Sequence, residues 1–174
     1  GVVRAKETPN FIGNRIGVFS MLATIYNTEK FGLRFDVVDD LTGRRLGRAK
    51  SATYRTADVV GLDTFAHVAK TMEDNLPKDP WHGFFSSPAW LKGLIDNGAL
   101  GAKTKAGIFK KEGKRIMMID PDAGEYVASN KKADSEVTDI LKEKDWGKKL
   151  AALRESQNPQ AQFLCAVLRD SFHY

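Results

Sequence analysis

Residues 6–16 read KETPNFIGNRI and open an apolar helical segment of the chain. From about residue 11 to residue 26, apolar side chains fall on two stripes that together cover most of the surface of a helix. A helix that is apolar on most sides is typical of a protein core, so we expect this segment to be a core helix.

Both ends of this helix carry signals in the sequence. Thr8 is a suitable N-cap with Pro9 in the first turn, and Gly32 is placed to end the helix in a left-handed conformation. Asn14 therefore lies within two turns of the start of the helix. There its amide can face whatever precedes the helix, so Asn14 is the first candidate for a functional side chain.

The following segments predict a mainly α fold with a small antiparallel β-meander. Further helices, with Ser51 and Ser87 as N-caps of two of them, are expected over about residues 36–41, 51–60, 63–76 and 88–97. Alternating apolar residues from Gly107 onward predict strands over about residues 108–111, 115–119 and 125–127. The first five residues resemble the tail of a short strand.

The last third of the chain is more charged. Residues 129–149 mix both signs of charge and predict a linker helix that is solvated on most sides. Two more helical pieces, residues 150–155 and 162–172, are separated by Asn158 and Pro159. We expect three parts: a helical domain over residues 1–112, a β-meander extension over residues 113–128, and the charged and helical segment over residues 129–174.

Composition sets broad limits on the function. The 174 residues are 42% hydrophobic and 28% charged, as in an ordinary globular protein, and carry a net charge of +5. This charge permits an anionic partner, such as nucleic acid, a membrane surface or a nucleotide-bearing ligand, and selects none of them. The single cysteine, Cys165, favours a reducing cytoplasmic setting over a secreted one. No apolar run approaches the ~20 residues of a membrane span.

The usual catalytic motifs are missing from the sequence. No strand is followed by the Gly-x-Gly-x-x-Gly pattern of a dinucleotide site, so no cofactor-binding residue is expected in this chain. His82 has no further ligand at metal-binding spacing, and no metal site is expected. We expect His82 to be a surface or packing residue and His67 to be a packing residue on a helix face.

Three blocks of sequence resemble the NAD-dependent 3-hydroxyacyl-CoA dehydrogenases, at the start of their helical C-terminal domain. Residues 6–15 are similar to the family pattern Lys-Asp-Thr-Pro-Gly-Phe-Ile-x-Asn-Arg and depart from it at Glu7 and Asn10. Residues 47–63, GRAKSATYRTADVVGLD, resemble the multifunctional fatty-acid oxidation members. Residues 101–109, GAKTKAGIF, are similar to the pattern Gly-x-Lys-Thr-Gly-x-Gly-Phe-Tyr. The match covers about residues 1–112.

The resemblance implies a fold like the C-terminal domain of 6-phosphogluconate dehydrogenase. It implies an enzyme that oxidises (3S)-3-hydroxyacyl-CoA to 3-oxoacyl-CoA in fatty-acid β-oxidation, with acyl-CoA as the substrate. NAD and the catalytic His-Glu pair would then belong to a Rossmann domain before Gly1, and this chain alone would be inactive. The resemblance also implies a homodimer or a pairing with a second helical domain, whose truncated start would lie in residues 129–174.

The resemblance suggests the site residues as well. The amide of Asn14 would hydrogen-bond the oxygen of the substrate or the catalytic histidine. The alternative is that Asn14 satisfies local backbone groups at a domain junction. Lys50, Ser51 and Thr53 are weaker candidates for substrate binding, because they lie in a loop that the family places near the active-site cleft.

A rival hypothesis is a basic module that binds nucleic acid. It would use the four basic residues between Arg44 and Lys50, namely Arg44, Arg45, Arg48 and Lys50, together with the lysines of residues 103–114. The simpler alternative for the basic loop is a solvated surface. The sequence lacks a recognition helix dense in Lys and Arg, and it lacks aromatic residues set among the basic ones.

Overall fold

The computed structural model describes residues 2, 4 and 7–174. The strand tail expected over residues 1–5 falls largely outside the described residues, as does Lys6 of the opening motif. The helices are α1 (Ile12–Phe31), α2 (Phe35–Thr42), α3 (Tyr54–Val60), α4 (Leu62–Asn75), α5 (Ala89–Asp96), α6 (Ser135–Ile140), α7 (Trp146–Glu155) and α8 (Pro159–His173). Short 3₁₀ turns are η1 (Arg44–Leu46), η2 (His82–Phe84) and η3 (Ala102–Thr104).

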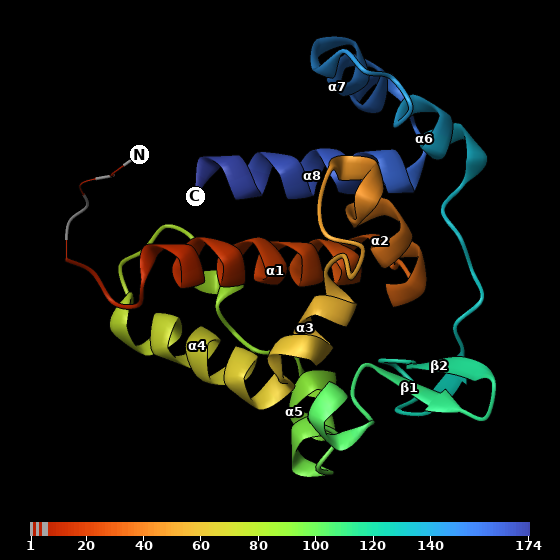
Figure 1. Ribbon diagram of the computed structural model, residues 1–174. Helices are drawn as coiled ribbons and strands as arrows, with labels where there is room; N and C mark the ends of the chain where they lie inside the picture. Colours follow the sequence, from red (N-terminus) through yellow and green to blue (C-terminus); the bar gives the residue numbers. More distant parts are fainter. Residues whose placement is uncertain (1, 3, 5–6) are drawn as a thin grey trace.

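The strands form one antiparallel sheet in the order β1-β2-β3. They are β1 (Phe109–Glu112), β2 (Arg115–Ile119) and β3 (Tyr126–Ala128), with Phe109 opposite Met118 and Met118 opposite Val127. The sheet lies at the end of the molecule away from α7 (Figure 1). The predicted fold class, mainly α with a small antiparallel meander, is confirmed.

Helix α1 occupies the middle of the molecule, with α8 along one side and α4 along the other (Figure 1). From Phe19 onward, α1 is buried through Phe19, Leu22, Ala23 and Ile25, as expected of a core helix. Its first turns are different, because Phe11, Ile12 and Ile16 are exposed. The prediction of a core helix is therefore confirmed only from Phe19 onward.

The start of α1 differs from the expectation. The residue before the helix is Phe11, no side chain caps the first turn, and Thr8 and Pro9 lie outside the helix. Asn10 adopts a left-handed φ of +68°, which turns the chain just before the helix. This conformation explains why the family pattern has Gly here, and why Asn, which tolerates positive φ, replaces it. The expected end is confirmed, because Gly32 has a φ of +61°.

Helix α3 is capped by a different helix and not by Ser51, so the expected cap is wrong. The carboxylate of Asp39, on α2, accepts hydrogen bonds from the backbone N–H groups of Thr53, Tyr54 and Arg55 at 3.1, 2.7 and 3.1 Å. These are orphan donors of the first turn, and a buried carboxylate satisfies three of them at once. Helix α5 likewise begins after Pro88 without a side-chain cap from Ser87.

Asp58 of α3 holds the segment that leads into the sheet. Its carboxylate accepts hydrogen bonds from the N–H groups of Ile108 and Phe109, both at 2.8 Å. A Cβ atom at Gly101 or Gly107 would overlap atoms of Asp58, so both positions require glycine. The third family block therefore packs directly against the second.

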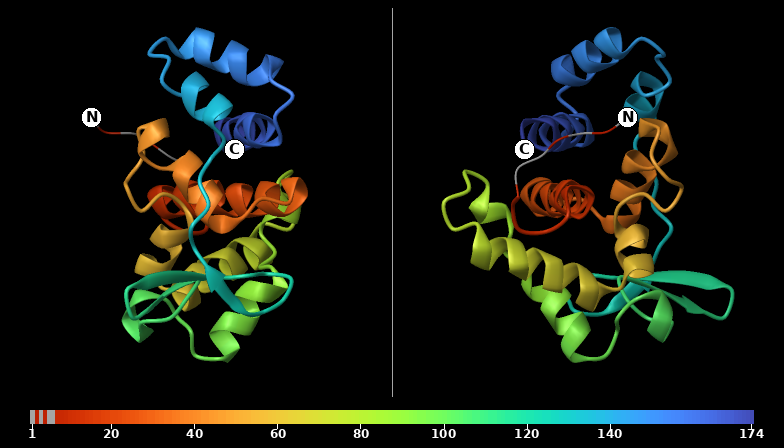
Figure 2. Two further views of the ribbon diagram at one scale, coloured as in Figure 1. Left: turned by 90° about the vertical axis from the view of Figure 1, so that its right-hand side faces the viewer. Right: turned by 60° about the vertical axis from the view of Figure 1, so that its left-hand side comes forward.

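Residues 129–149 do not form one linker helix, so that expectation is wrong. Residues 129–134 are extended, because the N–H groups of Lys131 and Ala133 bond to Asp36 and Asp40 of α2 at 3.0 and 3.1 Å. The short helix α6 and then α7 follow, beyond α8 on the side away from α4 (Figure 2). The last helix starts at Pro159, with the side chain of Asn158 as N-cap.

His82 and His67, the two histidines considered in the sequence, differ in burial. His82 is half-buried, and its Nδ1 lies 3.1 Å from the carbonyl oxygen of Leu76, as expected of a packing residue. His67 is exposed on α4, so the expectation that it packs is wrong. The apolar stripe of α4 that faces α1 runs through Phe65, Ala69 and Met72, and His67 lies off that stripe.

Candidate functional site

A groove of about 550 Å³ runs between α1 and the pair α3 and α4. Its apolar walls are Val18, Met21, Val60, Phe65 and Val68. Its polar groups come from α1, from the loop before α3 and from the two helices: Asn14, Ser20, Arg48, Thr53, Thr56 and Thr64. No lining residue is a His, Asp, Glu or Cys, so the groove holds an amide, hydroxyls and one cation but no general base.

Asn14 lies at the exposed end of the groove, on the first turn of α1. Its side chain makes no hydrogen bond with any residue that the structure describes. The neighbouring Arg15 does the opposite, because its guanidinium donates to the hydroxyl of Tyr174 at 2.6 Å and to Asp79 at 3.1 Å. In the Asn-Arg pair of the motif, the arginine ties parts of this chain together and the amide of Asn14 faces outward.

Two glycines keep the α1 side of the groove open. A Cβ atom built at Gly13 or Gly17 would meet no heavy atom within 4 Å, so packing inside this chain does not require either glycine. Glycine in a helix interior costs about 0.5–1 kcal/mol relative to alanine. The open space is therefore available to a group from outside the described residues.

Thr53 lines the groove directly, and Ser51 is joined to it through Thr56. Thr53 is buried and lines it, with its hydroxyl 3.0 Å from that of Thr42. Ser51 does not line it but accepts a hydrogen bond of 2.8 Å from the hydroxyl of Thr56, which does. Between them, Ala52 has a φ of +52°, an unfavourable conformation for a residue with a Cβ. Lys50 lines a separate pocket on the other side of this loop.

Arg48 is a groove residue that the sequence did not single out. Its side chain is half-buried, and burial lowers the pKa of its guanidinium. The guanidinium of Arg48 makes no hydrogen bond or ion pair with residues 7–174, although its backbone N–H donates to the carbonyl of Gly43 at 3.2 Å. A half-desolvated cation without a partner favours an anionic or negatively polarised group in the groove. In the sequence Arg48 is one of four basic loop residues, and only the fold separates it from the others.

The basic residues do not form one face. Arg44, Arg45 and Lys50 line the separate pocket, and Arg48 lines the groove. In the second predicted cluster, Lys103 is 2.6 Å from Asp63 and Lys110 is 2.6 Å from Glu112. A nucleic-acid surface needs its cations along one backbone track, so this arrangement speaks against the rival hypothesis.

The described part of the chain contains neither a metal-binding cluster nor a membrane-spanning helix. No group of three or more His, Cys, Asp or Glu side chains there is arranged to hold a metal ion. None of the described helices is both long enough and apolar enough to cross a membrane.

Known proteins resemble this chain over the residues that form the groove. The model of the family "3-hydroxyacyl-CoA dehydrogenase, C-terminal domain" matches residues 11–111. A probable 3-hydroxyacyl-CoA dehydrogenase of Bacillus subtilis is 38% identical over 174 residues, which are all of this chain and 22% of that protein. One of Deinococcus radiodurans is 43% identical over 111 residues, 64% of this chain and 31% of that protein.

A more distant relative is a putative fatty acid oxidation complex trifunctional enzyme of Rickettsia prowazekii. It is 24% identical over 122 residues, which are 68% of this chain and 17% of that protein. The chain thus spans between 17% and 31% of the length of these three relatives. The family match runs from the start of α1 to β1 and includes every residue that lines the groove. The chain belongs to the 3-hydroxyacyl-CoA dehydrogenase family and contains the C-terminal domain of that family.

Proposed function

We propose that this chain forms the substrate-side and oligomerising part of an enzyme that oxidises (3S)-3-hydroxyacyl-CoA to 3-oxoacyl-CoA in fatty-acid β-oxidation. The names of the similar proteins support the reaction. The observation that carries the proposal is the groove beside Asn14, which combines an outward-facing amide with apolar walls and holds no base of its own. Such a groove completes a site whose base comes from another domain.

Each part of the groove has a role in this proposal. The amide of Asn14 donates a hydrogen bond to the 3-oxygen of the substrate, or holds the catalytic histidine that the partner domain supplies. The apolar wall of Val18, Met21 and Phe65 receives the acyl chain. Thr53, with Ser51 and Lys50 in the same loop, contacts the remainder of the acyl-CoA.

The chemical step follows from these roles. An N-terminal Rossmann domain would hold NAD, which would supply the hydride acceptor for the oxidation at C3 of the substrate. The proton of the 3-hydroxyl passes to the histidine of that domain, and the C3–O bond becomes a carbonyl. A donor fixed at the substrate oxygen orients C3 and stabilises the charge that changes on this oxygen during transfer. Asn14 supplies that donor from a rigid helix.

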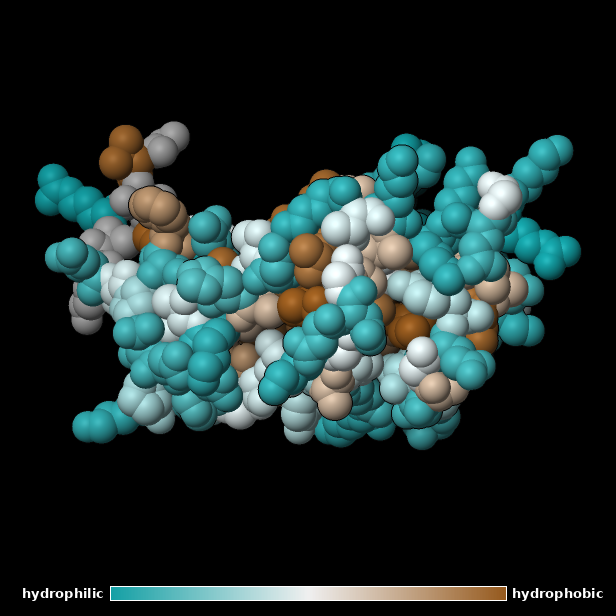
Figure 3. Space-filling model, turned by 90° about the horizontal axis from the view of Figure 1, so that it is seen from below, coloured by the Kyte–Doolittle hydropathy of each residue, from teal (hydrophilic) through white to brown (hydrophobic). Residues whose placement is uncertain are grey.

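The exposed apolar residues suggest where partners pack. Phe11 is 83% exposed and Ile16 54% exposed, both at the open end of α1. Figure 3 shows a different hydrophobic patch, near the middle of the face seen from below and among hydrophilic side chains. We assign the open end of α1 to the Rossmann domain or a second copy of the chain.

A second helical domain is the other expected partner. We propose that residues 129–174, after the meander at residues 113–128, form the start of such a domain, although their last helix, α8, packs along α1. We place the enzyme in the cytoplasm, because the chain has a single cysteine, Cys165.

Asn14→Ala in the protein that joins this domain to its Rossmann domain tests the proposal. Loss of a hydrogen bond to a developing charge lowers kcat by about 10²–10³, which is about 2.7–4 kcal/mol. The melting temperature should barely change, because Asn14 is exposed. Asn75→Ala is the matched control, since Asn75 is an exposed amide at the far end of α4 and lies outside the groove. An Asn14→Ala variant with normal kcat and a low melting temperature would show that Asn14 is structural.

The division of labour between domains has a separate test. The isolated chain should not oxidise 3-hydroxyacyl-CoA and should bind NAD weakly or not at all, because it has no dinucleotide fingerprint. Isothermal titration calorimetry with NAD measures this directly. Tight binding of NAD to the isolated chain would contradict the proposed division.

A further inference from the structure

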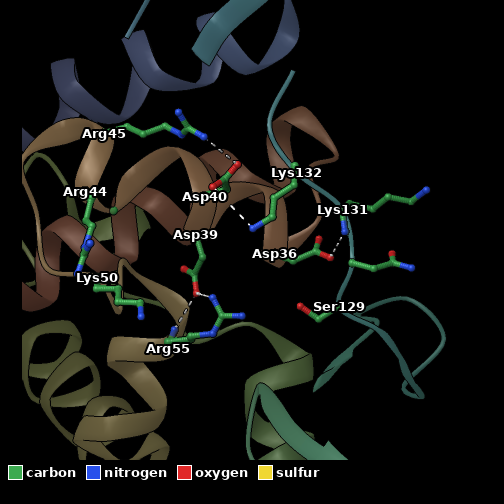
Figure 4. A pocket seen from close by; sticks show the side chains of 12 residues that line it. Asp36, Asp39, Asp40, Arg44, Arg45, Lys50, Arg55, Ser129, Lys131 and Lys132 are labelled. Atoms are coloured by element: carbon green, nitrogen blue, oxygen red, sulfur yellow. Dashed lines mark hydrogen bonds and ion pairs between the residues drawn. The ribbon is translucent and has the colours of Figure 1, made fainter. Parts of the chain in front are cut away.

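A second pocket, distinct from the groove, is lined mainly by charged side chains. It measures about 450 Å³ and lies between α2, the loop of residues 43–55 and the extended segment of residues 129–132. Figure 4 shows its charged residues. The cations are Arg44, Arg45, Lys50, Arg55, Lys131 and Lys132, and the anions are Asp36, Asp39 and Asp40. It shares no lining residue with the groove beside Asn14.

The three carboxylates are already committed within the chain. Asp36 accepts from Arg34 at 3.0 and 3.1 Å and from the N–H of Lys131. Asp39 accepts the three N–H groups at the start of α3 and lies 3.8 Å from the guanidinium of Arg55. The oxygens of these two side chains point to fixed N–H donors, so the floor of the pocket is not arranged for a cation.

Asp40 is shared between two cations at longer distances. It lies 3.7 Å from Arg45 and 3.9 Å from Lys132, and it accepts the N–H of Ala133 at 3.1 Å. These pairs are loose compared with the contact between Arg34 and Asp36. Arg45 and Lys132 can therefore turn toward a ligand without leaving a buried charge uncompensated.

Three of the cations, Arg44, Lys50 and Lys131, have no carboxylate partner among the described residues, and the side chain of Lys131 points away from those of Arg44 and Lys50 (Figure 4). Arg44 and Lys50 line the pocket on the side opposite Lys131 and Lys132 (Figure 4). Six cations against three carboxylates leave a surplus of three positive charges around one cavity. The hydroxyl of Ser129 and the amide of Asn130 add uncharged donors to the lining.

We propose that this pocket binds a phosphate-bearing anion, with Arg44 and Lys50 as its main contacts. A phosphate or diphosphate carries two or three negative charges, which match the surplus, and Arg and Lys are the side chains that bind it in proteins. The volume is within the range of small-ligand sites. The inference goes beyond the groove of the proposed function and shares only Lys50 with the acyl-CoA contacts proposed there.

Titration calorimetry with inorganic pyrophosphate tests the site. The double variant Arg44→Ala with Lys50→Ala removes two charges that hold no partner in the fold, so both substitutions should leave the melting temperature unchanged. The matched control is Lys78→Ala with Lys92→Ala, which removes the same charge from exposed positions outside the pocket. We expect pyrophosphate affinity to fall about tenfold or more in the first variant and less than about twofold in the control.

Two further ligands distinguish the source of the phosphate. Coenzyme A binding more tightly than its 3′-dephospho form, with the difference lost in the Arg44 and Lys50 variant, would assign the site to the 3′-phosphate of a nucleotide. Equal binding of the two forms, with pyrophosphate binding lost in the variant, would assign it to a diphosphate group. Either result supports the site.

Three results would overturn the proposal. One is no binding of pyrophosphate to the wild-type chain at low salt. Another is an equal loss of affinity in both double variants, which would show only an effect of net charge. The third is binding of duplex DNA that both double variants weaken equally, with no saturable pyrophosphate site, because that pattern belongs to a diffuse basic surface.

Discussion

Helix α1 carries two asparagines in opposite environments. Asn27, in the second half, is fully buried, and its amide donates to the carbonyl of Ala23 and to the carboxylate of Asp170 on α8 at 2.8 and 2.9 Å. Asn14, in the first half, is exposed and has no partner among the described residues. The same residue type on the same helix therefore holds two helices together at one end and faces outward at the other.

The side chains around the two asparagines differ in the same way. Around Asn27 the polar residues are buried and bonded, as with Thr24 and Thr28, whose hydroxyls donate to the backbone one turn earlier. Around Asn14 the helix has open glycines and exposed apolar residues. We call the half around Asn27 the closed half and the half around Asn14 the open half. The closed half stabilises the fold of this chain, and we infer that the open half contacts a partner.

The largest expected effects come from measuring both kcat and stability for the alanine variants of the two asparagines. Asn14→Ala should lower kcat by about 10²–10³ with little change in stability, and Asn27→Ala should do the reverse. Removing the Asn27 donor to the buried Asp170 should lower the free energy of unfolding by about 1.5–3 kcal/mol. Urea denaturation measures the free energy of unfolding of both variants, and steady-state kinetics measures their kcat. Equal effects in both assays would mean that the halves of α1 are not distinct.

The closed part of the molecule should also show a characteristic pH dependence. Burial raises the pKa of Asp39 to about 6 against the pull of its three N–H donors, and burial likewise raises the pKa of Asp58 to about 6. Between pH 4 and 6 the folded chain then binds more protons than the unfolded chain, so the free energy of unfolding falls as pH rises. Asp39 contributes up to about 3 kcal/mol to this fall.

Denaturation at a series of pH values from 4 to 7.5 measures this slope. Asp36 should not mask it, because its lowered pKa moves stability only below about pH 4. In Asp39→Asn the slope between pH 4 and 6 should become shallower, even though the variant is less stable at every pH. A free energy of unfolding that rises over this range would contradict the assignment.

The smallest expected effect concerns the open half. Gly17→Ala should raise the free energy of unfolding by about 0.5–1 kcal/mol, because the helix gains propensity and the methyl group meets no atom of the chain. Gly93→Ala is the matched control, since Gly93 lies on α5 and also has open space around it. Only Gly17→Ala should lower kcat/KM, if a substrate or partner occupies the open half of α1.

Part of the fold could be read from local patterns. The end of α1 at Gly32, the three strands and the family blocks depend on residues close together in the sequence, and all three expectations hold in the structure. The failed expectations concern helix starts and the charged segment of residues 129–149. At the start of α3 and in residues 129–134, distant aspartates of α2 supply the hydrogen bonds that local residues were expected to make, whereas α1 and α5 start without a side-chain cap.

The candidate site shows the same limit. Motif similarity singled out Asn14 and the loop of residues 50–53, because a motif records residue types and order. The sequence does not separate Arg48 from Arg44, Arg45 and Lys50, since all four belong to one basic run. Only the packing of α2 against α3 turns Arg48 into the groove and leaves the other three around a different pocket.

Sequence alone was sufficient for the family, the helical class and the absence of a dinucleotide fingerprint, because each depends on short-range order along the chain. The tertiary structure decided which half of α1 is buried, which caps the helices use and how the cations divide between two cavities. These outcomes depend on side chains that are far apart in the sequence, as with Asn27 and Asp170, and that meet only when the helices pack.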